Sequence, residues 1–373
     1  MANSFKKTAV ELLAAADVKI NGSRPWDIRV FDERFYQRAL SQGTLGLGES
    51  YMDNWWDAES LDQFFYQVLN AELQKKIKGF PRLWIAVKAV LLNLQRRSKA
   101  YKIGEKHYDI GNDLYTLMLD KRMNYSGAYW KDAKNLDQAQ EAKLDLICKK
   151  LGLKPGMSVL DIGSGWGGFA KYAAEKYNVK VVGITVSKEQ VKLAREICNG
   201  LPVDIRLQDY RNLEGKFDRI VSIGMIEHVG YKNYRIYMKV VYDCLHEDGL
   251  FLLQTIGSNK SEVIGDAWMD KYIFPDGMLP SPAHITKAVE GLFIMEDWHN
   301  FGADYDKTLM AWYSNFEKNW DTIKQNKKYD ERFYRMWKYY LLSCAGSFRA
   351  RNIQLWQIVF SRKGIPGGYT HRL

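Results

Sequence analysis

A glycine-rich turn that follows a short apolar stretch is the feature of this chain with the clearest potential for chemistry. Gly163, Gly165 and Gly168 have the spacing G-x-G-x-x-G, and Asp161 stands just before the first of them. This spacing lets the backbone approach a cofactor at the N-terminus of a helix, although a plain tight turn would also use glycine. The pattern therefore predicts a cofactor-binding loop, with a simple turn as the alternative.

The positions of the acidic residues separate two classes of cofactor. A dinucleotide site usually has Asp or Glu about 20 residues further on, where it holds the ribose hydroxyls. The corresponding stretch here, residues 183–187, has no acid, and the first one after it is Glu189. Asp161 instead suits S-adenosylmethionine, because a carboxylate can hold the cationic amino group of its methionine part. We therefore predict S-adenosylmethionine and keep a dinucleotide as the alternative.

Further cofactor contacts are expected where successive strands end. The residues that we predict there are Gly183, Thr185, Ser187, Gln190, Gln208, Asp209 and Tyr210. The amide of Gln190 carries both a donor and an acceptor and could bind two ribose hydroxyls. Asp209 offers a carboxylate to the adenine amino group, and Tyr210 offers a ring to stack on the base. Thr185 and Ser187 also suit the N-cap of a helix, which is the alternative for both.

The segment from Ser222 to Val229 should face the reactive end of the cofactor. Glu227 beside His228 could form an acid/base centre, while His228 could equally begin a helix and point away. Enzymes that methylate exocyclic amines of nucleic acids commonly have Asn or Asp, then Pro-Pro and an aromatic residue, at this point. The segment lacks that pattern. The sequence therefore predicts no nucleic-acid partner.

A regular alternation of strands and helices must position these residues. The expected strands are 159–162, 179–185, 203–208, 219–223 and 250–255, with 292–298 and 353–361 completing one edge. This alternation predicts a doubly wound, mostly parallel, seven-stranded α/β sheet, which binds its ligand at the carboxyl ends of its strands. The first hundred residues read as mostly helical, with a loop expected at 43–51. We therefore predict a smaller, mainly helical N-terminal domain before the sheet.

The charge of the chain indicates an anionic partner. The 373 residues carry a formal net charge of +10. Five basic residues crowd one short segment: Arg96, Arg97, Lys99, Lys102 and Lys106. Near an anionic bilayer each such charge contributes about 1 kcal/mol, although a solvated linker would have the same composition. We predict an N-terminal domain at 1–95, a basic linker at 96–106 and a catalytic domain at 107–373.

Other patterns narrow the class of protein. The hydrophobic share of 46% and the charged share of 26% are typical of a globular, soluble protein. No apolar run approaches the roughly 20 residues needed to cross a bilayer. The four cysteines form no C-x-x-C pair and the six histidines have no H-x-x-x-H spacing. We therefore expect a cytoplasmic protein without a metal site.

Five sequence blocks occur in order along the chain: Gly111 to Leu114, Tyr125 to Trp130, Gly163 to Gly168, Gly224 to Gly230, and Phe301 to Tyr305. Together they resemble the bacterial cyclopropane-fatty-acyl-phospholipid synthases. The similarity runs nearly from end to end and includes residues 45–52. It implies a class I methyltransferase fold, S-adenosylmethionine as donor, and methylene addition across the cis double bond of a phospholipid acyl chain.

The resemblance also implies a set of catalytic residues. The family binds a bicarbonate ion as the general base that deprotonates a carbocation, and its ligands correspond here to Gly127 (backbone), Glu227 (side chain), Ile256 (backbone) and Tyr305 (hydroxyl). Tyr125 and Ser126 would lie close to the donor. Gly127 stands where many members have Cys, and Gln254 where many have His. Gln254 can donate to an anion but cannot carry a proton away, so we expect no obligatory proton relay there. Gln254 and His228 complete the candidate catalytic residues.

The expected partner is an unsaturated phospholipid in an anionic membrane, reached by peripheral association with the inner face of the cell membrane. The resemblance further implies a homodimer, with the N-terminal domain binding lipid or dimerising. Two alternatives remain at this point. The first is a methyltransferase with another acceptor, such as a lipid that receives a branched methyl group. The second is a membrane-docking or dimerising module whose methyltransferase-like part is inactive.

Overall fold

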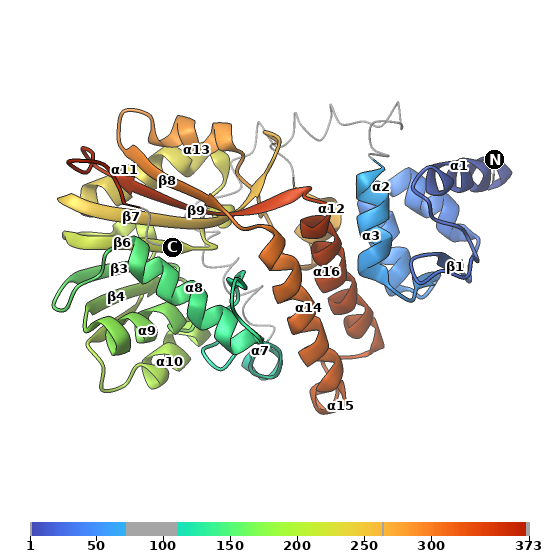
Figure 1. Ribbon diagram of the computed structural model, residues 1–373. Coiled ribbons are helices and arrows are strands. Elements are labelled where there is room, and N and C mark those ends of the chain that lie inside the picture. The colour runs from blue at the N-terminus through green and yellow to red at the C-terminus, as the bar shows by residue number, and fades with distance from the viewer. Residues whose placement is uncertain (1, 72–110, 263–264, 371–373) are drawn as a thin grey trace. The chain divides into compact units, whose positions relative to one another are not determined.

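The computed structural model describes residues 2–71, 111–262 and 265–370, and the chain divides into two compact units (Figure 1). Of the described residues, a helical unit combines 2–71, 265–275 and 305–353, and a sheet unit combines 111–262, 276–304 and 354–370. Each unit therefore draws on segments that are far apart in the sequence. Across the described ranges, no helix has the length and apolar content required to cross a membrane.

The helical unit packs around aromatic side chains. Its elements are α1 (Ala2–Ala14), β1 (Ile28–Val30), α2 (Arg34–Met52), β2 (Trp56–Ala58), α3 (Leu61–Asn70), α12 (Ala267–Tyr272), most of α14 (Ala303–Lys318), α15 (Trp320–Ile323) and α16 (Glu331–Arg349). Arg335 of α16 donates to the backbone oxygens of Tyr51 and Trp56 at 2.6 and 2.9 Å. Gly346 lets α16 approach α3 closely, because a Cβ there would lie 2.6 Å from the backbone oxygen of Asp62. The C-terminal helix α16 is thus joined to the N-terminal helices by both packing and charge.

These units differ from the domain division expected from the sequence. Residues 305–353, expected in the catalytic domain, form part of the helical unit, because α16 packs against α2 and α3. The segment expected as a loop at 43–51 lies within α2, where only Gly43 leaves helical geometry, with φ 61° and ψ −136°. Gly48 serves close packing, since a Cβ there would overlap the ring of Trp268. The predicted linker at 96–106 lies outside the described residues.

The sheet unit contains the predicted seven-stranded, mostly parallel sheet. The strands are β3 (Ser158–Ile162), β4 (Lys180–Thr185), β5 (Val203–Leu207), β6 (Phe217–Ile223), β7 (Leu245–Ser258), β8 (Ile294–Asn300) and β9 (Ile353–Ser361), in the order β5-β4-β3-β6-β7-β9-β8. The pairs β4–β5, β3–β4, β3–β6 and β6–β7 are parallel, and β8–β9 is antiparallel. The predicted fold class is therefore confirmed.

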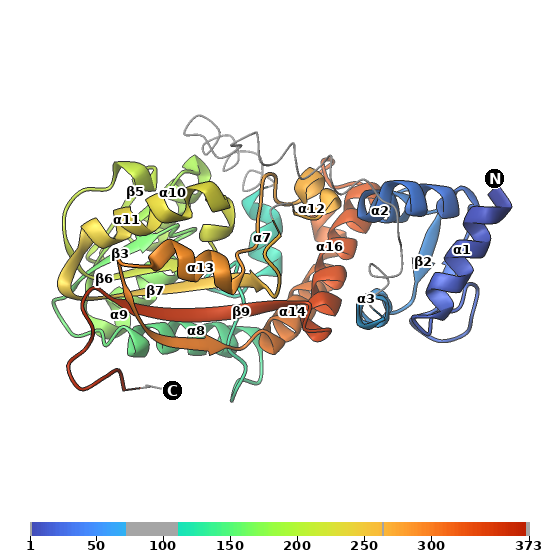
Figure 2. The ribbon, with the colours of Figure 1, turned by 90° about the horizontal axis from the view of Figure 1, so that it is seen from above.

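Helices cover both faces of this sheet (Figures 1 and 2). They are α8 (Leu136–Lys150), α9 (Gly168–Tyr177) and α10 (Lys188–Ile197) on one face, and α11 (Tyr234–Cys244) and α13 (Pro282–Val289) on the other. Successive residues of a strand point to opposite faces of the sheet and pack against different helices. Val159 packs against α8 and α9, whereas Leu160 packs against α11. A further helix, α7 (Asn112–Met118), precedes α8.

The strand order reverses at β3, which is flanked by β4 on one side and β6 on the other. The chain proceeds from β3 to β4 and β5 in one direction and returns to β6 on the opposite side. Ligands of doubly wound sheets bind at such a reversal, outside the carboxyl ends of the strands. The glycine-rich turn after β3 therefore lies at the expected place for a ligand.

Candidate active site

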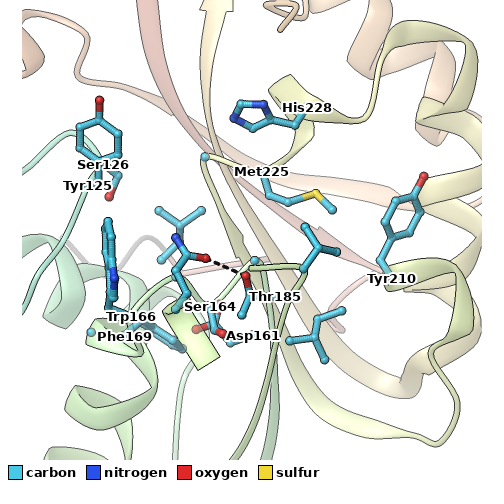
Figure 3. A pocket seen from close by; sticks show the side chains of 18 of the residues that line it. Tyr125, Ser126, Asp161, Ser164, Trp166, Phe169, Thr185, Tyr210, Met225 and His228 are labelled. Atoms are coloured by element: carbon cyan, nitrogen blue, oxygen red, sulfur yellow. Dashed lines mark hydrogen bonds between the residues drawn. The ribbon is translucent and has the colours of Figure 1, made fainter. Parts of the chain in front are cut away.

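A cavity of about 1240 Å³, including space open to solvent, lies at the carboxyl ends of β3, β4, β5 and β6. Most of the predicted cofactor residues line it: Tyr125, Ser126, Asp161, Gly163, Gly165, Thr185, Gln190, Gln208, Asp209 and Tyr210. Figure 3 shows Tyr210 on the opposite side of this cavity from Tyr125 and Trp166. His228 also lines it, as does Met225, so apolar and polar walls meet in one pocket.

The glycine-rich turn forms the floor of this pocket. The N–H groups of Gly163 and Ser164 both donate to the backbone oxygen of Ile184, at 2.9 Å each, which joins the turn to β4. Gly163 and Gly165 have φ angles of 85° and 55°, which glycine adopts without strain. Apart from Gly165 itself and its two neighbours in the chain, no described atom lies within 4 Å of a Cβ placed on Gly165. The turn therefore presents open backbone to a ligand, as the sequence predicts.

Gly183 and Ser187 belong to the frame of the pocket and are not among the residues that line it. A Cβ on Gly183 would lie 2.9 Å from the Cβ of Ser164, so glycine there lets the turn lie close to β4. The Ser187 hydroxyl accepts from the backbone N–H of Gln190 at 3.3 Å and caps α10. The structure therefore gives Ser187 the N-cap arrangement that the sequence left as its alternative.

The polar side chains after β4 and β5 are fixed by neighbours. The Thr185 hydroxyl donates to Oε1 of Gln190 at 2.7 Å, which orients the Gln190 amide (dashed line in Figure 3). Asp209 accepts from Nε and Nη2 of Arg211 at 2.9 and 2.7 Å. The Tyr210 ring packs edge-on against Tyr237, with centroids 5.2 Å apart. Arg211, which the sequence analysis did not single out, thus neutralises the carboxylate proposed for adenine.

Asp161 is a buried carboxyl group at the end of β3, with 1% of its surface exposed. Within the described part of the chain, its Oδ2 has no hydrogen-bond partner. Burial raises the pKa of Asp161 to about 7, and the positive charge of Lys143 opposes this rise. Lys143 lies on α8, is fully buried and lines the same pocket. A carboxylate in this position is suited to receive a cation from a ligand.

Lys143 was not predicted as a site residue, although its position in the helix could have indicated it. The buried positions of α8 recur at helical spacing as Ala139, Lys143, Ile147 and Lys150, so two lysines stand at positions that usually carry apolar residues. A charge at such a position is seldom buried without a partner. Lys150 has one in Asp297, at 2.9 Å. Lys143 faces the pocket instead.

The pocket has both polar and apolar surfaces, as S-adenosylmethionine does. The Ser164 hydroxyl, like Oδ2 of Asp161, is buried with no hydrogen-bond partner among the residues that the structure describes. These two groups stand beside the open backbone of Gly165. Trp166, Phe169, Ile184 and Met225 supply apolar walls around them. A ligand with a cationic end and an aromatic end could place the cation against the unpartnered polar groups and the aromatic ring against the apolar walls.

Glu227 is the second buried carboxyl group of the sheet unit. It lies in the short 3₁₀ helix η2 (Ile226–His228) after β6, with 7% of its surface exposed. Its Oε1 accepts from the backbone N–H of Ile256 at 2.7 Å, and no described group hydrogen-bonds Oε2. Burial raises the pKa of Glu227 to about 7 and lowers that of the neighbouring His228 to about 4. At neutral pH, His228 is therefore uncharged.

Gln254 of β7 joins two further predicted residues to this region. Its Nε2 donates to the backbone oxygen of Gly127 at 3.3 Å, and its Oε1 accepts from Gln357 of β9 at 3.0 Å. The structure thus connects Gln254 with Gly127, and Glu227 with Ile256, at the ends of β6 and β7. Tyr305 belongs to the helical unit, where its ring packs on Phe348 with centroids 4.5 Å apart.

Burial raises the pKa of Cys344 to about 12, so this thiol stays protonated at neutral pH, as suits a structural residue. In the described ranges, no three His, Cys, Asp or Glu side chains gather as a metal site would require.

Comparison with known proteins places the chain in a family. The model of the family described as mycolic acid cyclopropane synthetase matches residues 95–358. The chain is 56% identical to the cyclopropane-fatty-acyl-phospholipid synthase of Escherichia coli K12 over 367 residues, covering 98% of this chain and 95% of that protein. It is 35% identical to sphingolipid C9-methyltransferase A of Emericella nidulans, over 76% of this chain and 57% of that protein.

Solved structures agree with this placement. The cyclopropane synthase MmaA2 of Mycobacterium tuberculosis matches with a TM-score of 0.66 at 28% identity, covering 72% of this chain and 99% of that one. The mycolic acid cyclopropane synthase CmaA1, complexed with SAH and CTAB, matches with a TM-score of 0.63 at 32% identity, covering 70% and 97%. The chain therefore belongs to the mycolic acid cyclopropane synthetase family and is an enzyme with the class I methyltransferase fold.

Proposed function

We propose that this enzyme transfers a methylene group from S-adenosylmethionine to the cis double bond of an unsaturated phospholipid acyl chain, forming a cyclopropane fatty acid. The observation that carries the proposal is the pocket at the reversal of the sheet. There a buried carboxylate whose Oδ2 has no described partner lies beside an open glycine backbone. The end-to-end similarity to a cyclopropane-fatty-acyl-phospholipid synthase supports the choice of acceptor.

The residues of the pocket have distinct roles in this proposal. Asp161 binds the ammonium group of the methionine part, and the glycine backbone accommodates its chain. Gln190 binds the ribose hydroxyls through the amide that Thr185 orients. Tyr210 stacks on the base. When bound, S-adenosylmethionine supplies a methyl group that is electrophilic because it is attached to a sulfonium.

The reaction requires a base and a dry site. The alkene forms a bond to the methyl carbon as the carbon–sulfur bond breaks, which leaves a carbocation on the acyl chain and S-adenosylhomocysteine. Loss of one proton from the new methyl group closes the ring. Water would capture the cation, so apolar and aromatic walls must exclude it. Candidate walls in the sheet unit are Tyr125, Tyr129, Trp130 and Trp298.

We further propose that Glu227, the backbone of Gly127 and Ile256, and the hydroxyl of Tyr305 hold a bicarbonate ion that supplies the base. In support, Oε2 of Glu227 has no hydrogen-bond partner among the described residues, and the pKa of Glu227 near 7 lets a neutral carboxyl donate to an anion. The Ile256 N–H donates to Oε1 of Glu227, so this hydrogen bond would fix the Glu227 carboxyl group beside the Ile256 backbone in the proposed ion site. Gln254 holds the Gly127 carbonyl and carries no proton in this scheme.

The membrane is part of the proposal. Access to phospholipid requires peripheral association with an anionic surface, which we assign to the cytoplasmic face of the cell membrane. The N-terminal residues up to about 95 would bind lipid or form a homodimer. Phe31, which is 61% exposed, and the guanidinium groups of Arg34 and Arg38 over the Trp55 ring give this region an amphipathic surface.

Analysis of lipid products tests the proposal. The purified chain is incubated with S-adenosylmethionine labelled in its methyl group and vesicles of unsaturated anionic phospholipid, in buffer with and without bicarbonate. We expect acyl chains that gain one methylene unit, resist hydrogenation and form more slowly without bicarbonate. A product that hydrogenation reduces would instead support a lipid C-methyltransferase, the activity named for the Emericella nidulans relative. Binding of the donor without any labelled lipid would contradict both.

A further inference from the structure

Lys143 is a buried cation in the pocket wall that the proposed reaction does not use. It projects from α8 and is fully buried, yet it lines the cavity together with Asp161. Its Nζ lies 3.1 Å from the hydroxyl oxygen of Ser126 and 3.5 Å from Oδ1 of Asn124. The ammonium group of Lys143 has three N–H donors, and among the described residues it has only these two acceptors within hydrogen-bond distance. Both acceptors are uncharged.

The nearby carboxylates do not account for this lysine. Asp120 already accepts from the backbone N–H and the side-chain amide of Asn124, at 2.8 and 2.9 Å, and from the backbone N–H of Arg122 at 3.0 Å. Asp161 interacts with Lys143 through its charge, and its Oδ2 has no partner in the described structure. Burying an ammonium group is unfavourable unless an anion contacts it directly.

The ligand of the proposed function supplies the missing anion. A methionine moiety carries an ammonium group and a carboxylate on the same carbon atom, and the pocket wall carries one carboxylate and one ammonium in Asp161 and Lys143. Ser126, a pocket residue in contact with Lys143, adds a hydroxyl that can donate to a carboxylate.

We propose that Lys143 and Ser126 bind the α-carboxylate of the methionine moiety, while Asp161 binds its ammonium group. The inference rests on the proposed function, because it concerns the same pocket. It makes Lys143 a binding residue that selects ligands with an intact amino-acid end. Burial lowers the pKa of free Lys143 to about 8, and the ligand carboxylate would raise it again.

A comparison of two ligands tests the role of Lys143. The affinities of S-adenosylhomocysteine and of its decarboxylated analogue, which lacks only the carboxylate, are measured by calorimetry on the full chain. We expect the wild type to prefer S-adenosylhomocysteine by about 10- to 100-fold, the range of a charge-assisted hydrogen bond. Lys143→Met should remove most of this preference while binding the decarboxylated analogue about as well as the wild type.

Two further variants complete the test. Lys149→Met removes a lysine of the same helix that is exposed and paired with Asp145, and it should leave the preference unchanged. Ser126→Ala should reduce the preference in part, and it gives an answer even if Lys143→Met does not fold. A preference that survives both Lys143→Met and Ser126→Ala would overturn the inference alone. Failure of the wild type to bind either ligand would overturn the proposed function.

Discussion

Two buried carboxyl groups lie at the carboxyl ends of the adjacent parallel strands β3 and β6: Asp161 near the end of β3 and Glu227 just after β6. They differ mainly in the charged and polar groups around them. Burial raises the pKa of each to about 7, and each has one oxygen without a hydrogen-bond partner in the described residues. Asp161 is near the cation of Lys143, whereas Glu227 accepts one backbone N–H from Ile256. The two carboxyl groups are thus similarly buried, but one has a cation nearby and the other has only a neutral hydrogen-bond donor.

The difference in environment suits the two groups to the different roles proposed for them. A carboxylate near a fixed cation is helped to stay ionised, so Asp161 can hold the ammonium group of a ligand. A carboxyl group without such a cation holds its proton more readily and can share it with an anion, as proposed for Glu227. Substitution of one group should therefore affect ligand binding, and substitution of the other should affect turnover.

Glu227→Gln tests this division with the largest expected effect. The amide keeps the size of the side chain but cannot exchange a proton, so product formation should fall about 1,000-fold, within the range for loss of acid–base catalysis. The dissociation constant for S-adenosylhomocysteine should change less than about threefold, because Asp161 and the glycine turn are untouched. Both are measured on one preparation, by lipid analysis and calorimetry.

Glu214→Gln, at an exposed position outside the pocket, is the matched control and should match the wild type in both measurements. Tyr305→Phe should resemble Glu227→Gln if its hydroxyl serves the same base. Wild-type turnover in Glu227→Gln would remove Glu227 from the mechanism.

The same substitution should change how stability depends on pH. The pKa of Glu227 rises from 4.5 to about 7 on folding, so the folded protein binds this proton more tightly than the unfolded chain. The resulting stabilisation is present below pH 4.5 and is lost as pH rises toward 7. Between these limits the wild type should lose about 3 kcal/mol more free energy of unfolding than Glu227→Gln. Equal losses in denaturant titrations would show that Glu227 titrates normally.

Asp161→Asn should weaken binding and spare the chemistry. Loss of the charge that meets the ammonium group should raise the dissociation constant for S-adenosylhomocysteine about 100-fold. Turnover at saturating S-adenosylmethionine should recover to within a few-fold of the wild type. Asp204→Asn, at an exposed position of β5, is the control. Unchanged affinity would mean that Asp161 has only a structural role.

The affinity for S-adenosylhomocysteine should also depend on pH. Ligand ammonium prefers ionised Asp161, so affinity should rise as pH passes through the pKa of about 7. Between pH 6 and pH 7.5 the expected gain is about tenfold at most, since one proton is released. Asp161→Asn should not show this rise in affinity over the interval, and Glu227→Gln should keep the slope. A slope in Asp161→Asn equal to that of the wild type would assign the titration to another group.

Local sequence patterns predicted the sheet well, and most of the residues predicted to contact a cofactor line one cavity. The strand expected at 353–361 has those bounds in the structure, and the turn after β3 is formed as its glycines require. The first part of β7, residues 245–249, was missed because its polar residues hide the strand pattern. The roles predicted for individual site residues stay predictions until the variants are measured.

Contacts between distant segments, and the directions in which individual side chains point, could not be predicted in the same way. The packing of α16 on α3 depends on a glycine, Gly346, that meets a backbone nearly three hundred residues earlier in the chain. The pairing of Asp209 with Arg211 was hidden because the spacing does not reveal side-chain orientation. Lys143 could be noticed in the sequence as a charged residue at a buried helix position, yet only the structure shows that its side chain lines the pocket.

A crystal structure of the full chain with S-adenosylhomocysteine tests the central claim most directly. We expect ligand density over the turn after Asp161, with the ammonium group against Oδ2 of Asp161 and the adenine ring beside Tyr210. The proposed binding mode would be contradicted by an empty turn, or by a ligand that has its adenine ring at Asp161 and its amino-acid end elsewhere.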